Sequence, residues 1–259
     1  MGKKLIRTLF ISDVHMGSGF SRADLLLETL EAYEYKSLYI VGDFIDGWKF
    51  NRNFHWTQSC NDVLKKILEL AETIPVYYCI GNHDEFLRSF APATLNEIKI
   101  AERFIHTTAG GRKMIVRHGD FLDYAVKHMA WLAHFGDKML SFILTLNRAS
   151  YWLQQKIKIR YWSLSNYLRR KVNKVLSTLK NFKKMIMFET VEEELEGVIC
   201  GHIHAPEIVE EDDFLYCNCG DWVENGSAIV EHLDGKFELI HNENFPKLIT
   251  PVVEYDWPG

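Results

Sequence analysis

Five short polar motifs constrain this chain most, because each directly follows a run of β-prone apolar residues. Such runs predict strands, and polar groups that follow parallel strands gather where the strand ends meet. The runs span residues 8–12, 38–41, 76–80, 113–117 and 197–200. The motifs that follow them are Asp13-Val14-His15, Gly42-Asp43-Phe44-Ile45-Asp46, Gly81-Asn82-His83-Asp84, His118-Gly119-Asp120 and Gly201-His202-Ile203-His204.

These motifs offer carboxylates, imidazoles and one amide, but no thiolate. Oxygen and imidazole ligands suit hard or borderline divalent cations such as Mn²⁺, Fe²⁺, Zn²⁺ or Mg²⁺. Taken singly, each motif has a plain explanation: Gly-Asp after a strand is typical of a turn, and His-x-His also occurs as a surface pair. Five such motifs in this order, each behind a predicted strand, favour a metal site over coincidence.

The segments between the motifs predict an α/β fold. Residues 21–35 carry apolar side chains at helical spacing with Ser21 as the predicted N-cap, and residues 62–71 form a second amphipathic helix. This β-α-β-α-β order indicates a sheet covered by helices, with ligands at the carboxyl ends of its strands. Further along, Gly110-Gly111 and Asp234-Gly235 predict hairpins, the second with a two-residue turn, so we expect an antiparallel second half.

The five motifs together resemble those of the calcineurin-like metallophosphoesterases, and the match runs from Asp13 to His204. The resemblance implies a four-layer α-β-β-α sandwich and a centre of two divalent ions, in which Asp43 bridges both. It also implies that His83 is the catalytic imidazole and that Asp46 orients it. The implied ligands are Asp13, His15, Asp43 and His204 for one ion, and Asp43, Asn82, His118 and His202 for the other. Such an ion pair can clamp the oxygens of a phosphoryl group and activate a water.

Within that family, the sequence is similar to the branch that contains UDP-2,3-diacylglucosamine diphosphatase. The similarity lies in residues 11–15, 41–48 and 118–120 and in an insertion after the fourth motif. It implies cleavage of UDP-2,3-diacylglucosamine to UMP and an acylated sugar 1-phosphate in lipid A synthesis, commonly with Mn²⁺. It also implies substrate contacts at Asn82 and Asp123. The best-known members of the branch carry Arg where this chain has His83, which places the particular substrate in doubt.

The insertion, at about residues 125–190, has a helical pattern and a strongly basic composition. It holds 13 Lys and Arg against two acidic residues, a formal charge of +11, whereas the rest of the chain sums to −16. Three interpretations compete: a solvated helical hairpin, a nucleic-acid-binding surface, and a cap that meets an anionic membrane or an acylated anionic substrate. We favour the third, with residues 1–259 as a single metallophosphoesterase domain that carries this cap.

The five cysteines show no disulfide or zinc spacing, which favours a reducing compartment. No secretory signal is evident and the longest apolar run, residues 139–146, is too short to span a bilayer. We therefore expect a cytoplasmic protein, peripheral at the inner membrane if its substrate is an acylated lipid. The alternatives are a phosphodiesterase or phosphatase for another lipid-linked or nucleotide-linked substrate, and a nuclease. A non-enzymatic scaffold is disfavoured because His83 is retained.

Overall fold

The computed structural model describes residues 3–51, 53–120, 195–211 and 213–245. The chain divides into two compact units, one formed by residues 1–119 with 187–259 and the other by residues 120–186. The first unit holds the five motifs, except for Asp120 at the end of the fourth, and is described below. The predicted basic cap at residues 125–190 and the predicted substrate contact Asp123 lie outside the described residues. The domain organisation expected from the sequence therefore stays a prediction.

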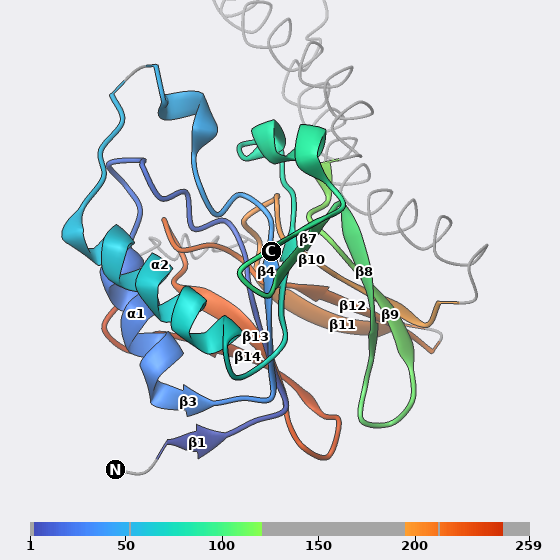
Figure 1. The fold of residues 1–259 in the computed structure, drawn as a ribbon. Coiled ribbons are helices and arrows are strands. Elements are labelled where there is room, and N and C mark those ends of the chain that lie inside the picture. Colours follow the sequence, from blue (N-terminus) through green and yellow to red (C-terminus); the bar gives the residue numbers. More distant parts are fainter. Residues whose placement is uncertain (1–2, 52, 121–194, 212, 246–259) are drawn as a thin grey trace, which may run out of the picture. The chain divides into compact units, whose positions relative to one another are not determined.

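A seven-stranded mixed sheet forms the centre of the first unit (Figure 1), and four neighbouring strands in its middle are parallel. These are β2, β4, β5 and β7, and the flanking strands β13, β14 and β6 are antiparallel to their neighbours. The strands in sheet order are β14 (Phe237–His241), β13 (Ser227–Glu231), β2 (Thr8–Ile11), β4 (Ser37–Val41), β5 (Val76–Cys79), β7 (Ile98–Ala101) and β6 (Ala93–Leu95).

The second sheet has five strands and shows that the prediction of an antiparallel second half was only partly right. Its central strand β10 runs parallel to both neighbours, β9 and β12. Parallel neighbours need a long connection, which the chain provides between β9 and β10. Strand β11 pairs antiparallel with β12 at the edge of the sheet. The predicted hairpin β8–β9 is confirmed. The strands in order are β11 (Glu207–Glu211), β12 (Phe214–Asn218), β10 (Gly197–Cys200), β9 (Lys113–Arg117) and β8 (Arg103–Thr107).

The β13–β14 hairpin is also present, but its turn is longer than predicted. His232 N–H donates to the carbonyl of Lys236, so Leu233, Asp234 and Gly235 form the loop. Gly235 has a φ of +85°, the left-handed backbone that a three-residue hairpin loop requires. The Asp-Gly pair correctly marked the turn, whereas the loop length depends on how the two strands pair.

Both α-helices of the described residues pack on one face of the seven-stranded sheet, α1 (Ala23–Ala32) beside α2 (Gln58–Ala71). The predicted Ser21 cap was wrong, because the Ser21 hydroxyl donates to the carbonyl of Val14 and the helix begins two residues later. The second helix begins earlier than predicted, since the Thr57 hydroxyl accepts from Cys60 N–H and caps it. The first helix ends at Ala32, where the chain turns directly into the short strand β3 (Tyr33–Glu34). Strand β3 pairs with β1 (Lys4–Leu5) in a separate two-stranded sheet.

Strands of the large sheet are buried on both faces, which explains their continuous apolar sequence. In β2, Leu9 and Ile11 pack under the helices, whereas Phe10 packs between the two sheets against residues such as Met114 and Ile199. The described residues thus form three layers, helices on a sheet on a sheet, and are consistent with the mixed-sheet fold expected. A second helical layer is not seen among the described residues, so the fourth layer of the predicted sandwich stays a prediction.

The carboxyl ends of β2, β4 and β5 meet those of β9 and β10 at one end of the fold, and the motif loops cross-link there. Asp13 N–H donates to the carbonyl of Gly42 at 3.1 Å, and Gly201 N–H donates to that of His118 at 3.0 Å. Two short 3₁₀ helices, η1 (Gly47–Lys49) and η2 (Glu85–Phe90), extend the second and third motifs. The topology therefore brings motifs from distant parts of the chain to one edge, as expected from parallel strands.

Candidate metal centre

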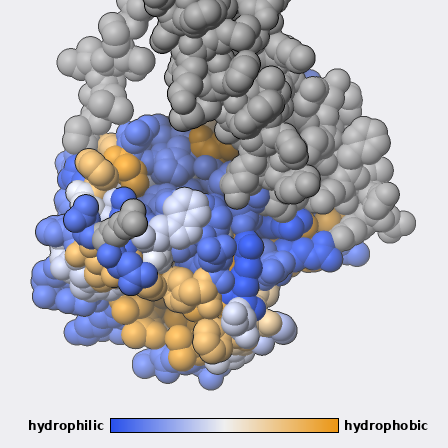
Figure 2. Space-filling model, turned by 90° about the horizontal axis from the view of Figure 1, so that it is seen from above, coloured by the Kyte–Doolittle hydropathy of each residue, from blue (hydrophilic) through white to orange (hydrophobic). Residues whose placement is uncertain are grey.

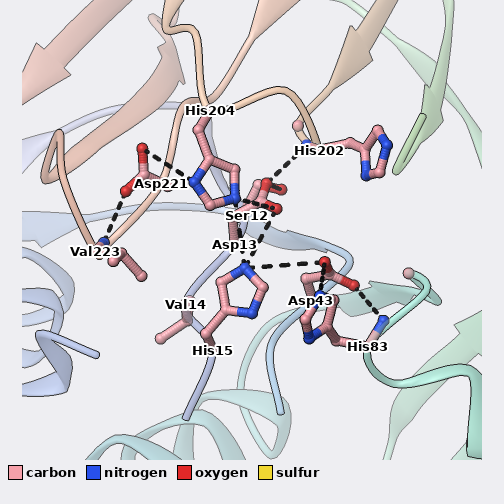
Figure 3. Close-up of polar contacts among 12 residues, drawn as sticks. Ser12, Asp13, Val14, His15, Asp43, His83, His202, His204, Asp221 and Val223 are labelled. Carbon is pink, nitrogen blue, oxygen red and sulfur yellow. Dashed lines mark hydrogen bonds and ion pairs between the residues drawn. The ribbon is translucent and has the colours of Figure 1, made fainter. Parts of the chain in front are cut away.

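Three overlapping groups of potential ligands lie at this edge, and His15, Asp43 and His83 form the one that overlaps the other two. Asp13, His15 and His204 form the first of the two clusters described next (Figure 3). Asp13 Oδ1 lies 3.2 Å from His204 Nε2 and 3.7 Å from His15 Nε2, and the two Nε2 atoms are 3.4 Å apart. All three side chains point toward one another from loops that follow β2 and β10. One carboxylate oxygen and two imidazole nitrogens this close can bind a single divalent ion.

Asp43, His118 and His202 form the second cluster, and Asp43 links it to the first. Asp43 Oδ2 lies 3.3 Å from His118 Nε2 and 3.9 Å from His15 Nε2. The ligating atoms of Asp43, His118 and His202 lie within 4.8 Å of one another. Because the Asp43 carboxylate faces both clusters, it occupies the position that a bridging ligand between two ions requires.

Buried polar atoms that lack a hydrogen-bond partner show that these residues fit a cation. Among the described residues, Asp13 Oδ1, His118 Nε2 and Asn82 Oδ1 are buried without such a partner. Burying unsatisfied acceptors and charge is costly, and native proteins rarely tolerate it without compensation. Divalent ions would satisfy all three, and these are atoms of three residues that the family resemblance assigned as ligands.

Polar partners on the Nδ1 side of two rings, a hydrogen bond for His118 and a carboxylate for His204, leave their Nε2 atoms available to a metal. His118 Nδ1 donates to the carbonyl of Val41 at 2.8 Å, so the lone pair of the neutral ring lies on Nε2. His204 Nδ1 lies 3.8 Å from Asp221 Oδ2, and Asp221 is fully buried. Sequence analysis missed Asp221, which lies outside the five motifs and carries no signal in its own neighbourhood.

The buried carboxylates and imidazoles of the centre shift one another's pKa values. Burial alone would lower the pKa of His118, but the carboxylates of Asp13 and Asp43 outweigh it and raise that pKa to about 10. Burial likewise opposes ionisation of Asp43, yet His118 and the His83 backbone N–H hold the pKa of Asp43 below its usual range. The protonated His118 ring therefore offsets part of the charge of the two carboxylates, and a divalent ion would take over that role once the proton leaves.

The backbone at the candidate ligands is itself unusual. Asp13, His15, Asp43, His202 and His204 all have φ between 50° and 68°, a left-handed conformation that non-glycine residues seldom adopt. Such conformations persist where the surrounding structure enforces them, often at functional sites. Gly42 also has positive φ, at +80°, and a Cβ there would overlap the His118 ring. The glycine of the second motif is thus required by the close approach of His118.

His83 and Asp46 lie beside the two clusters as a hydrogen-bonded pair. His83 Nδ1 is 2.9 Å from Asp46 Oδ1, and His83 Nε2 is 4.0 Å from Asp43 Oδ2. Asp46 is buried, whereas His83 is partly open to solvent. The Asp46 carboxylate at Nδ1 thus orients the imidazole, and Nε2 lies toward the Asp43 carboxylate.

Asp84, the last residue of the third motif, joins two motif loops and was missed as a site residue. Its carboxylate accepts hydrogen bonds from Phe44 N–H at 2.9 Å, the Tyr78 hydroxyl at 2.6 Å and Gly81 N–H at 2.5 Å. Burial, and then the charge of Asp43, raise the pKa of Asp84 to about 6. The motif itself contained the signal, but only the structure shows that this residue fastens the loop of Asp43 to the loop of Asn82.

Comparison with known protein families agrees with this geometry. The family model of the calcineurin-like phosphoesterases matches residues 6–206. The chain belongs to this family. Membership implies divalent metal ions and a metal-dependent hydrolase of phosphoric esters, in agreement with the two clusters above.

Curated relatives of this family member are named UDP-2,3-diacylglucosamine hydrolase. The protein of Vibrio atlanticus is 27% identical over 92% of this chain and 98% of its own length. The protein of Coxiella burnetii is 27% identical over 90% of this chain and 96% of its own length. The protein of Vibrio cholerae is 25% identical over 87% of this chain and 94% of its own length. These similarities support the branch suggested by the sequence.

Eight of the ten predicted site residues are linked by short contacts in this family member. Asn82 precedes His83 and has a buried Oδ1, and Asp123 falls outside the described residues. All five cysteines are buried and free, as the spacing predicted. Within the described part of the chain, no helix is both long and apolar enough to cross a membrane.

Proposed function

We propose that this metal-dependent phosphohydrolase cleaves the pyrophosphate of UDP-2,3-diacylglucosamine to give UMP and the acylated sugar 1-phosphate. The observation that carries the phosphohydrolase chemistry is the pair of clusters joined by Asp43. The relatives' names, over nearly the full length of each chain, support the particular substrate. Two bound divalent ions, with Mn²⁺ as our first choice, would supply positive charge at the phosphoryl oxygens and activate a water.

Seven side chains would hold these ions. Asp13, His15, Asp43 and His204 are proposed for one ion, and Asp43, Asn82, His118 and His202 for the other. The buried, partnerless oxygen and nitrogen atoms of Asp13, Asn82 and His118 support these assignments. Fe²⁺, Zn²⁺ and Mg²⁺ suit the same mixture of oxygen and imidazole ligands.

His83 is proposed as the general acid. In its protonated form, Nδ1–H donates to Asp46 and Nε2–H is directed away from Asp46. As the oxygen of water bonds to phosphorus, that water gives one proton to the solvent, the bond from phosphorus to the leaving oxygen breaks, and its electron pair stays on that oxygen. The leaving oxygen takes the proton from Nε2, so His83 ends neutral with Nδ1–H still bonded to Asp46. Such a positioned acid contributes about 10²–10⁴-fold to the rate.

The basic segment 125–190 is proposed to meet the anionic, acylated substrate and the anionic cytoplasmic face of the inner membrane. Its formal charge of +11, interleaved with aromatic residues, is the composition that such a surface requires. The remainder of the chain sums to −16, so contact with an anionic surface is expected through this segment rather than through the rest.

A second candidate function is a phosphodiesterase or phosphatase for another nucleotide-linked or lipid-linked substrate. It is favoured by the His83–Asp46 pair, because the branch of the first candidate typically has Arg in place of His83. Protonation by an imidazole matters most for a poor leaving group such as an alcohol, because an alkoxide departs slowly. A sugar phosphate is a better leaving group and departs without strong acid assistance.

One experiment separates the two candidates. Mn²⁺-loaded protein is incubated with UDP-2,3-diacylglucosamine, with UDP-N-acetylglucosamine and with bis-4-nitrophenyl phosphate, and products are resolved by chromatography. Release of UMP from the acylated compound alone supports the first candidate. Cleavage of the diester alone supports the second, and release of mononucleotides from an added oligonucleotide would indicate a nuclease. The His118→Ala variant, which lacks a proposed ligand, is the control for contaminating activity.

A further inference from the structure

An exposed tryptophan covers one face of the proposed acid. The indole of Trp48 stacks on the His83 imidazole, with ring centroids 3.8 Å apart and an interplanar angle of 29°. Trp48 retains 57% of its surface exposed, so burial of the indole does not explain its presence. It belongs to a group of exposed aromatic residues in and around η1 and η2, namely Trp48, Phe50, Phe54, Phe86 and Phe90. These two short helices lie at the upper end of the fold in Figure 1. Figure 2, which views the molecule from that end, shows apolar patches on this face.

Three consecutive residues each hold a different part of His83. The Asp46 carboxylate takes Nδ1 at 2.9 Å, Gly47 N–H donates to the His83 carbonyl at 2.9 Å, and the Trp48 indole covers the ring face. A Cβ on Gly47 would lie 2.7 Å from that carbonyl oxygen, so a side chain there would force the segment away from His83. The sequence Asp46-Gly47-Trp48 therefore clamps His83 at its edge, its backbone and its face.

The face contact restricts a motion that the other contacts allow. The ring turns about its Cβ–Cγ bond, and a single hydrogen bond at Nδ1 opposes that turning only until the bond breaks. Such turning moves Nε2 away from its position facing Asp43. The only other ring against His83 within the described residues is His15, which meets it edge-on at 4.5 Å and 85°. Trp48 closes the solvent side of a ring whose side chain is still 20% exposed.

We infer that Trp48 is a positioning residue, which holds the His83 ring so that Nε2 faces the leaving oxygen. This inference rests on the proposed function of His83. A displacement of about 1 Å in a reacting group can cost on the order of 10²-fold in rate, so loss of the indole should lower the rate of steps that need the proton. Substrates whose leaving group departs without a proton should be affected far less.

The kinetic test uses two esters of UMP that differ only in the leaving group, phenol or 4-nitrophenol, with Mn²⁺-loaded protein. For the phenyl ester, Trp48→Ala should lower kcat about 10–100-fold with KM within twofold, and the nitrophenyl ester should lose less than about threefold. Trp48→Phe, which keeps an aromatic face, should restore most of the rate. Phe90→Ala, which removes an aromatic residue that is 71% exposed on η2, is the matched control and should match the wild type.

A double variant decides whether Trp48 acts through His83. In a His83→Ala background, adding Trp48→Ala should cost less than twofold. An additional loss there equal to that of the single variant, or equal losses for both esters, would overturn the inference. Wild-type rates in His83→Ala alone would instead overturn the proposed role of His83, whatever Trp48 does.

A measurement on metal-free protein tests the stack without turnover. The His83 ring protons should be shifted upfield in the NMR spectrum by the indole, and this shift should vanish in Trp48→Ala but persist in Phe90→Ala. A His83 spectrum unchanged by Trp48→Ala would overturn the inference even if neither ester is cleaved.

Discussion

Replacing Asp84 should destabilise the fold by removing the residue that ties the second motif loop to the third. The carboxylate is fully buried and accepts from Phe44 N–H, Gly81 N–H and the Tyr78 hydroxyl. Asp84→Asn has nearly the same shape, but its amide group must face at least one of these donors. One buried donor without a partner costs about 1–3 kcal/mol, which is the loss expected for Asp84→Asn.

Asp84→Ala removes all three acceptor contacts and leaves a cavity, so we expect a larger loss, about 3–5 kcal/mol. Urea unfolding of the metal-free protein measures both losses, with Asp24→Ala as the matched control. Asp24 is an exposed carboxylate paired with Arg22, and its removal should cost no more than about 1 kcal/mol. An Asp84→Ala protein within 1 kcal/mol of the wild type, or less destabilised than Asp84→Asn, would refute this reasoning.

Three further predictions follow from the same geometry. His83→Ala should bind metal normally, as measured by elemental analysis, and lose about 10²–10⁴-fold in rate on a confirmed substrate; loss of metal would contradict its assignment as an acid. Gly42→Ala should push the His118 ring aside and reduce the bound metal to one ion or none per chain, whereas two tightly bound ions would contradict the packing argument. Burial would raise the pKa of Glu231, but hydrogen bonds from His106 and a backbone N–H hold it below its ordinary value of about 4.5. Its contribution to stability should therefore be complete above that value and be lost as the pH falls below it, so melting temperatures of the wild type and Glu231→Gln should converge in acid; a constant difference would contradict this.

The position of the centre could be predicted from sequence because its residues sit directly after strands. Apolar runs indicated β2, β4, β5, β9 and β10 to within one residue, and parallel packing then placed the residues after them at one edge. The β8–β9 hairpin also followed from local signals, since a glycine pair between two short β-prone runs leaves few alternatives.

Features that depend on tertiary contacts could not be predicted. The parallel direction of β10 is set by its neighbours in the sheet, and the start of α1 is set by a hydrogen bond of Ser21 to Val14. Asp221 reaches His204 only through the fold. The stack of Trp48 on His83 likewise joins two loops that no local pattern connects.

The left-handed backbone at the candidate ligands was also invisible in the sequence. Aspartate and histidine tolerate positive φ better than most residues, but nothing local requires it at Asp13 or His204. The strained backbone appears where several loops must turn sharply to aim their side chains at one point. It is therefore a consequence of the site rather than a signal for it.

The central claim is that seven side chains of this chain hold two divalent ions that share Asp43. Anomalous diffraction from crystals of the Mn²⁺-loaded protein tests it most directly, because it locates each ion independently of any activity. We predict two peaks, one among Asp13, His15 and His204 and the other among Asp43, His118 and His202, with Asp43 bound to both. A single peak, or ions bound away from these residues, would contradict the account.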